Sequence, residues 1–129
     1  MPPGPRIVTG TLWHRVDHAF AAAFLLASTG WLVWGVEATT WSRALFWLLA
    51  PDFVFVPIAV AAARSHGAWP AWGAALYNAA HSYVTLVSTA LIASLVQGHV
   101  VWPLLAWAAH IEIDRACGFD LREYRPQPA

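Results

Sequence analysis

The chain has 129 residues, of which 59% are hydrophobic and only 11% are charged, and its formal net charge is zero. Because a soluble domain carries about a quarter of charged residues, this composition indicates an integral membrane protein. The zero net charge argues against nucleic acid as a partner, since phosphate backbones are bound by basic surfaces. The single cysteine excludes an internal disulfide and a four-thiolate metal site.

Four apolar segments follow one another along the chain, at residues 12–36, 41–63, 71–96 and 100–117. Each is close to the roughly 20 residues that span a bilayer as a helix, and no sustained two-residue alternation indicates strands. The segments predict a single all-α membrane domain over residues 12–120. The proline-rich residues 1–11 predict a disordered lead-in, and residues 121–129 predict a polar tail at the surface.

The connections between the segments are short, which forces neighbouring helices to run antiparallel and predicts an up-down-up-down four-helix transmembrane bundle. Six of the seven arginines fall on the side that holds both chain ends, and Arg43 alone falls on the other side. By the positive-inside rule both termini are cytoplasmic, so we expect a multi-pass protein of the cell inner (plasma) membrane, with the lipid bilayer as its environment. The six arginines are Arg6, Arg15, Arg64, Arg115, Arg122 and Arg125.

Ionisable residues inside these apolar segments are the main functional signal. At about 1.5 Å per residue, Asp52 lies about 16 Å and His110 about 15 Å below the outer ends of their helices, and His81 also falls near the midplane. Asp114 and Asp17 fall roughly 6 Å nearer the cytoplasm. His110 and Asp114 are four residues apart, so they share one helix face. All four predicted helices therefore contribute to one polar band.

Each of these residues taken alone has a plain structural explanation, such as a core histidine bonded to a carbonyl, or a His110–Asp114 pair. Together, two carboxylates and two histidines at mid-membrane depth are costly, and a functional polar centre explains them better. Histidine and carboxylate form the ligand set of zinc, iron or manganese, which predicts a divalent metal bound by Asp52, His81, His110 and Asp114.

Three further residues are candidates for catalytic roles. Asp17 could be an additional ligand or could orient an imidazole, and Tyr77 and Asn78, one turn before His81, could donate hydrogen bonds to a substrate. A metal in such a site could activate water for hydrolysis. The same groups without metal could relay protons, two facing histidines could hold a haem, and the polar groups could serve only to fix helix register.

Three blocks of the sequence carry a resemblance to a known family. They read Ala-Pro-Asp at 50–52, Gly-Ala-Ala-Leu-Tyr-Asn-Ala-Ala-His-Ser-Tyr at 73–83, and Trp-Ala-Ala-His-Ile-Glu-Ile-Asp-Arg-Ala-Cys-Gly-Phe at 107–119. With Arg15 and Asp17 in the first helix, they resemble a family of small bacterial integral membrane proteins, domain of unknown function 4260. The resemblance supports the fold and the four polar positions. Because the family has no established activity, it implies no chemistry.

A second similarity concerns the order of motifs alone. An inner-membrane family described as metal-dependent hydrolases also places Pro-Asp first, then His-Ser, then a histidine four residues before an aspartate. We therefore expect a membrane-embedded metal-dependent hydrolase of a lipid or amphipathic substrate. The alternatives are a proton-coupled transporter or channel subunit, for which four helices would have to form a homo-oligomer, and a structural membrane protein without catalytic role.

Overall fold

A computed structural model describes residues 11–65 and 69–122 of the chain. These residues are all-helical, and no strand occurs among them. The elements in chain order are α1 (Leu12–Trp34), α2 (Trp41–Leu49), the 3₁₀ helix η1 (Ala50–Val54), α3 (Phe55–Arg64), α4 (Ala71–Ala80), α5 (Tyr83–Gln97) and α6 (Leu104–Cys117). The predicted lead-in and tail lie outside the described residues, apart from Thr11, Leu121 and Arg122.

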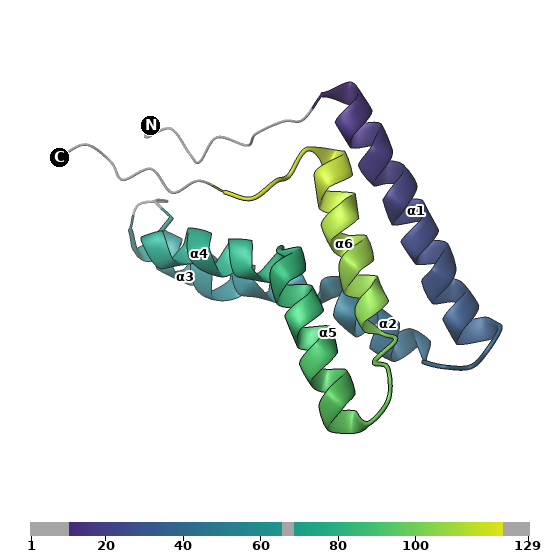
Figure 1. The fold of residues 1–129 in the computed structure, drawn as a ribbon. Coiled ribbons are helices and arrows are strands. Elements are labelled where there is room, and N and C mark those ends of the chain that lie inside the picture. Colours follow the sequence, from purple (N-terminus) through teal and green to yellow (C-terminus); the bar gives the residue numbers. More distant parts are fainter. Residues whose placement is uncertain (1–10, 66–68, 123–129) are drawn as a thin grey trace.

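Helices α1 and α6 lie side by side and form the most extensive helix pair (Figure 1). The Thr11 hydroxyl accepts a hydrogen bond from the backbone N–H of His14 and caps the start of α1. Helix α6 ends at Gly118, whose φ of 91° only glycine adopts without strain, and the N–H of Phe119 closes the end on the carbonyl of Asp114 at 2.8 Å. The guanidinium of Arg15 reaches across and donates to the carbonyl of Ala116 at 2.9 Å.

The second predicted segment forms one helical unit from Trp41 to Arg64, with the 3₁₀ turn η1 in its middle. Pro51 explains the turn, because it lacks the N–H that an α-helix needs and its ring clashes with the preceding turn. Asp52 follows directly, so the local unwinding occurs where the sequence placed a candidate ligand.

The third predicted segment differs from one uninterrupted helix, since α4 and α5 meet at a bend of 57°. Ser82 begins α5 as its cap, with its hydroxyl accepting from the N–H of Val84 at 3.1 Å. The indole N–H of Trp107 donates to the carbonyl of Ala80 at 2.8 Å, which satisfies an acceptor that the end of α4 leaves open. The bend places His81 between two helices rather than inside one.

The fourth predicted segment is also shorter than expected, because α6 begins only at Leu104, after Pro103. Its 14 residues extend about 21 Å, short of a hydrocarbon core of about 30 Å. Within the described residues, Leu12–Trp34 and Trp41–Arg64 are long and apolar enough to cross a membrane, and α4 with α5 adds a third candidate if the bent pair is one span.

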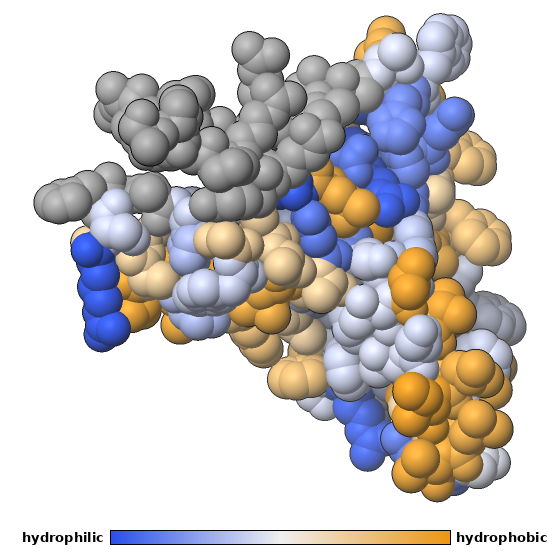
Figure 2. All heavy atoms as spheres, turned by 60° about the vertical axis from the view of Figure 1, so that its left-hand side comes forward, coloured by the Kyte–Doolittle hydropathy of each residue, from blue (hydrophilic) through white to orange (hydrophobic). Residues whose placement is uncertain are grey.

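The outer surface is apolar over most of its area, as expected for a protein in lipid. Large hydrophobic side chains such as Phe20, Phe24, Val84 and Leu95 are mostly exposed. Figure 2 shows hydrophilic side chains gathered near the end where α1 begins and α6 ends, and hydrophobic ones over much of the opposite end. The described chain therefore has the helices and the surface of a membrane protein.

Candidate metal centre

The four predicted ligands meet in one place, although they come from three separate parts of the fold. Asp52 is supplied by η1, His81 by the junction of α4 and α5, and His110 and Asp114 by consecutive turns of α6. The Pro51 turn, the bend at residue 81 and the one-turn spacing on α6 are the local features that bring them together. We call these four residues the metal cluster.

The ligand atoms of the metal cluster lie within a few ångströms of one another. The two Nε2 atoms of His81 and His110 are 3.2 Å apart. Oδ1 of Asp52 is 3.8 Å from Nε2 of His81 and 3.5 Å from Nε2 of His110. Oδ2 of Asp114 is 3.3 Å from Nε2 of His81 and 3.7 Å from Nε2 of His110.

The distances that involve the two histidines are those of a metal site. Zinc bonds of about 2.0–2.2 Å to nitrogen and oxygen place neighbouring ligands of a tetrahedron about 3.3–3.6 Å apart. Five of the six separations among the four ligand atoms run from 3.2 to 3.8 Å, and the sixth would join the two carboxylates. Asp52, His81 and His110 form a group that could hold a metal ion, and Asp114 offers a fourth ligand from the same helix face as His110.

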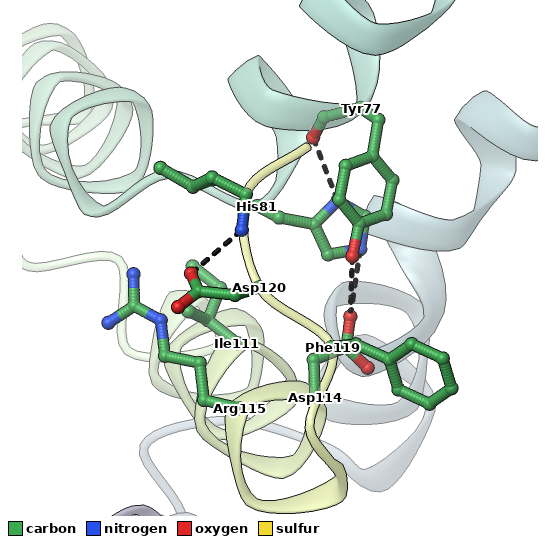
Figure 3. Close-up of a pocket in the computed structure, with 8 residues that line it drawn as sticks. Tyr77, His81, Ile111, Asp114, Arg115, Phe119 and Asp120 are labelled. Carbon is green, nitrogen blue, oxygen red and sulfur yellow. Dashed lines mark hydrogen bonds and ion pairs between the residues drawn. The ribbon is translucent and has the colours of Figure 1, made fainter. Parts of the chain in front are cut away.

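His81 is held in the orientation that metal binding requires. Its Nδ1 lies 2.9 Å from the carbonyl oxygen of Tyr77, and because a carbonyl can only accept, Nδ1 carries the proton. In the neutral imidazole the lone pair is then on Nε2, which faces the rest of the metal cluster. The Tyr77 ring stacks on the imidazole at 4.0 Å and 17°, which fixes the ring plane (Figure 3). A ligand histidine bonded through its second nitrogen in this way is typical of metal sites.

The charge of the metal cluster also points to a cation. Two carboxylates and two neutral imidazoles carry a charge of −2, and both histidines are buried. In the described part of the chain, Asp52 and Asp114 form ion-pair contacts only with these histidines and with no arginine. Two carboxylates without a cationic partner inside apolar helices are costly, and a divalent cation would neutralise them.

A small cavity of about 10 Å³ adjoins the metal cluster. It is lined by residues of α4, of the α4–α5 junction and of α6, and by residues that follow α6: Tyr77, His81, Ile111, Asp114, Arg115, Phe119, Asp120 and Leu121 (Figure 3). This is the room that one water molecule needs, and the hydroxyl, imidazole and carboxylate groups provide polar partners for it.

Of the three predicted catalytic residues, only Tyr77 contacts the metal cluster. The Tyr77 hydroxyl donates to Oδ2 of Asp114 at 3.4 Å and so belongs to the site. Asn78 faces away from it, because its side chain donates to the carbonyl of Arg122 at 2.8 Å and accepts from the N–H of Arg122 at 2.6 Å. Asp17 is exposed on α1, and among the described residues it has no hydrogen bond or ion pair. A substrate-handling role for Asn78 or Asp17 stays a prediction.

A second polar cluster surrounds the buried Glu112, and sequence reasoning assigned no role to it. We call it the Glu112 cluster (His18, Tyr83, Glu112 and Arg115). Glu112 is 5% exposed. One of its oxygens lies 2.5 Å from Nδ1 of His18, and the other accepts from the Tyr83 hydroxyl and lies 3.8 Å from Arg115. The sequence could have indicated this cluster, because Glu112 lies two residues after His110. This spacing places Glu112 on another face of α6, with other partners.

The comparisons with known proteins give a family and no activity. Residues 11–126 match the family described as Domain of unknown function (DUF4260). No curated protein and no solved structure matches the chain. The matched range covers most of the 129 residues and includes every member of the metal cluster. The chain therefore belongs to the DUF4260 family, as the three sequence blocks predicted.

Proposed function

We propose that this protein is a membrane-embedded metalloenzyme that hydrolyses a lipid or amphipathic substrate at a divalent zinc, iron or manganese ion. The observation that carries the proposal is the set of five separations of 3.2–3.8 Å among the nitrogen and oxygen atoms of the metal cluster. The unbalanced charge of the two carboxylates and the orientation of His81 support it independently.

The proposal assigns metal binding to four residues and a hydrogen-bonding role to a fifth. Asp52, His81, His110 and Asp114 would hold the ion, which would supply an acidified water and a polarised carbonyl. The Tyr77 hydroxyl, now donating to Asp114, lies where it can donate instead to an oxygen that gains negative charge. The adjoining cavity has room for one water, which favours a bound reactant over a conduction path.

The proposal includes a topology. The start of α1 and the end of α6 lie at one end of the molecule, and the α1–α2 and α5–α6 connections lie at the opposite end (Figure 1). In the same view α3 and α4 run across the direction of α1 and α6 (Figure 1). We propose that both termini are cytoplasmic, as the arginine distribution favours, and that the protein lies in the inner (plasma) membrane. The bend in the third segment and the short α6 make it an irregular bundle, and a homo-oligomer would shield part of its surface.

Elemental analysis of the protein, purified in mild detergent without chelator, tests the metal centre. We expect close to one zinc, iron or manganese ion per chain, lost on dialysis against a chelator and restored on reloading. An Asp17→Asn variant is the matched control, because its carboxylate lies outside the metal cluster, and it should keep the ion. Protein that holds no metal even after reloading would contradict the proposal.

Replacing Tyr77 with phenylalanine tests the catalytic role separately from metal binding. The Tyr77 carbonyl that orients His81 is unchanged in this variant, so metal content should stay at the wild-type level. Loss of one donor to a developing oxyanion costs about 10²–10³-fold in turnover. The measurement is hydrolysis of a long-chain fluorogenic ester in detergent by metal-loaded protein. Equal turnover of the variant and the wild type would remove Tyr77 from the mechanism.

A further inference from the structure

One face of the second helical unit is apolar, exposed and interrupted by a single carboxylate. Leu45, Leu49, Val56 and Val60 are each between 49% and 66% exposed. Asp52 lies among them at steps of three and four residues, within the 3₁₀ turn η1 that separates the leucines from the valines. We call these five residues the Asp52 stripe. They extend over about 25 Å along α2, η1 and α3.

Asp52 is the exposed edge of the metal cluster. Its side chain is 47% exposed, whereas the side chains of His81 and His110 are 4% and 9% exposed. The cavity that adjoins His81 and Asp114 has room for no more than one water. Among the described residues, Asp52 is therefore the member of the metal cluster most accessible to a larger substrate.

Asp52 also lies near the middle of Trp41–Arg64, a segment long and apolar enough to cross a membrane. Leucine and valine side chains flank it in both directions. We infer that the exposed side of Asp52 faces hydrocarbon, that the Asp52 stripe is the substrate-binding surface of the proposed enzyme, and that it takes a long-chain acyl ester or amide directly from the bilayer. This inference rests on the proposed function, because it gives the metal cluster its substrate class and access route.

The depth of Asp52 in its helix determines which kind of substrate bond can reach the metal cluster at low cost. A phosphodiester would bring a negative charge to the middle of a span, where charged groups cost several kcal/mol. A divalent ion on two carboxylates has no net charge, so a phosphodiester bound to it would leave the site with a net negative charge at this depth. A neutral ester or amide carbonyl avoids it, and its hydrocarbon chain can lie along the leucine and valine side chains.

The reaction on an ester is balanced with water as the only co-reactant. The oxygen of water bonds to the acyl carbon, and the C–O bond to the alcohol breaks. One proton of the water goes to the departing alkoxide, and the other stays on the carboxyl group of the fatty acid product. The water fits in the cavity beside His81 and Asp114, whose lining includes no residue of the stripe, so the two reactants would reach the site along separate paths.

A second copy of the chain is the other conceivable occupant of the stripe. Two copies packed on this face about a two-fold axis would bring two Asp52 carboxylates together near the centre of the interface. While no ion is bound, the two carboxylates would repel each other in this apolar interface, which disfavours this packing in the metal-free protein.

Nitroxide labels test the route without any activity measurement. Labels are placed at Val56→Cys and Val60→Cys on the stripe and at His99→Cys in the α5–α6 connection, all in a Cys117→Ser background and in lipid nanodiscs. We expect oxygen, which concentrates in lipid, to relax the stripe labels, and a water-soluble nickel chelate to relax only the label at 99. Leu49→Cys is the reserve position if a stripe variant does not fold. Relaxation of the stripe labels by the nickel chelate, or protection from both reagents, would overturn the inference.

A second measurement uses dodecanoyl hydroxamate, a metal-binding group on a twelve-carbon chain, with acetohydroxamate as the short-chain control. On zinc-loaded protein, the long-chain probe should immobilise the label at 56 and leave the label at 99 unchanged, while acetohydroxamate should affect neither. A mobile label at 56 while the long-chain probe occupies the metal would refute the stripe as the binding surface. If the protein binds no metal, the proposed function fails, and the oxygen and nickel measurements still report whether the stripe faces lipid.

Discussion

Replacing His110 with alanine is expected to remove the metal from an otherwise folded protein. His110 contributes an Nε2 atom 3.2 Å from that of His81 and 3.5 and 3.7 Å from the two carboxylates, so it is central to the metal cluster. Changes to residues that merely orient a ligand cost 10–100-fold in metal affinity. Loss of a ligand should cost more than about 100-fold, and the variant should contain almost no metal after gel filtration.

The same result is expected for His81→Ala, and comparison of the two excludes an indirect effect. His110 is on α6 and His81 at the α4–α5 junction, so a shared loss of metal points to a shared ion rather than to damage in one helix. Far-UV circular dichroism checks that both variants keep their helices. If a folded His110→Ala protein held metal with wild-type affinity, the metal cluster would not be the metal site.

Replacing Glu112 with leucine is expected to have the largest effect on stability. Glu112 joins three helices, since it contacts His18 on α1, Tyr83 on α5 and Arg115 on α6. Removing one partner of a buried ionic group typically costs 3–5 kcal/mol, because the remaining polar groups lose their hydrogen bonds. His18 and Arg115 keep some exposure to solvent, so we expect about 3 kcal/mol, at the lower end of this range.

Unfolding by SDS in bicelles, followed by tryptophan fluorescence, measures this change. Asp17→Leu is the matched control, since Asp17 is exposed next to His18, and it should change the free energy of unfolding by less than about 0.5 kcal/mol. A double-mutant cycle of Glu112→Leu with His18→Leu should give a coupling energy of about 1–3 kcal/mol. A coupling energy of zero would mean that the contact between His18 and Glu112 does not stabilise the fold.

The helices and the metal cluster could be predicted from the sequence because both depend on local patterns. Apolar runs of membrane length predict helices at 12–36 and 41–63, and the structure has them at Leu12–Trp34 and Trp41–Arg64. The spacing of His110 and Asp114 predicts a shared helix face whatever the tertiary fold. Asp52 and His81 could be added because ionisable side chains are rare in such segments.

The remaining features depend on contacts between distant residues. No proline or glycine marks the bend at His81, which is stabilised by an indole from α6 and a histidine ring bonded to its own helix. The partner of Asn78 is residue 122, which lies 44 positions away. The pairing of His18 with Glu112 follows from the packing of α1 on α6, and in that packing Asp17, one residue before His18, turns to another side of the helix.

The origin of the ligands in η1, α4 and α6 has a consequence for how the protein is made. The two ligands on α6 are the last part of the ligand set to be synthesised, so no partial chain that ends before this helix contains a complete site. Under the proposed function, a metal could be held by all four ligands only after α6 has packed against η1 and the α4–α5 junction. An ion bound there would act as a late check on biogenesis, because it would stabilise only chains in which these three parts have assembled.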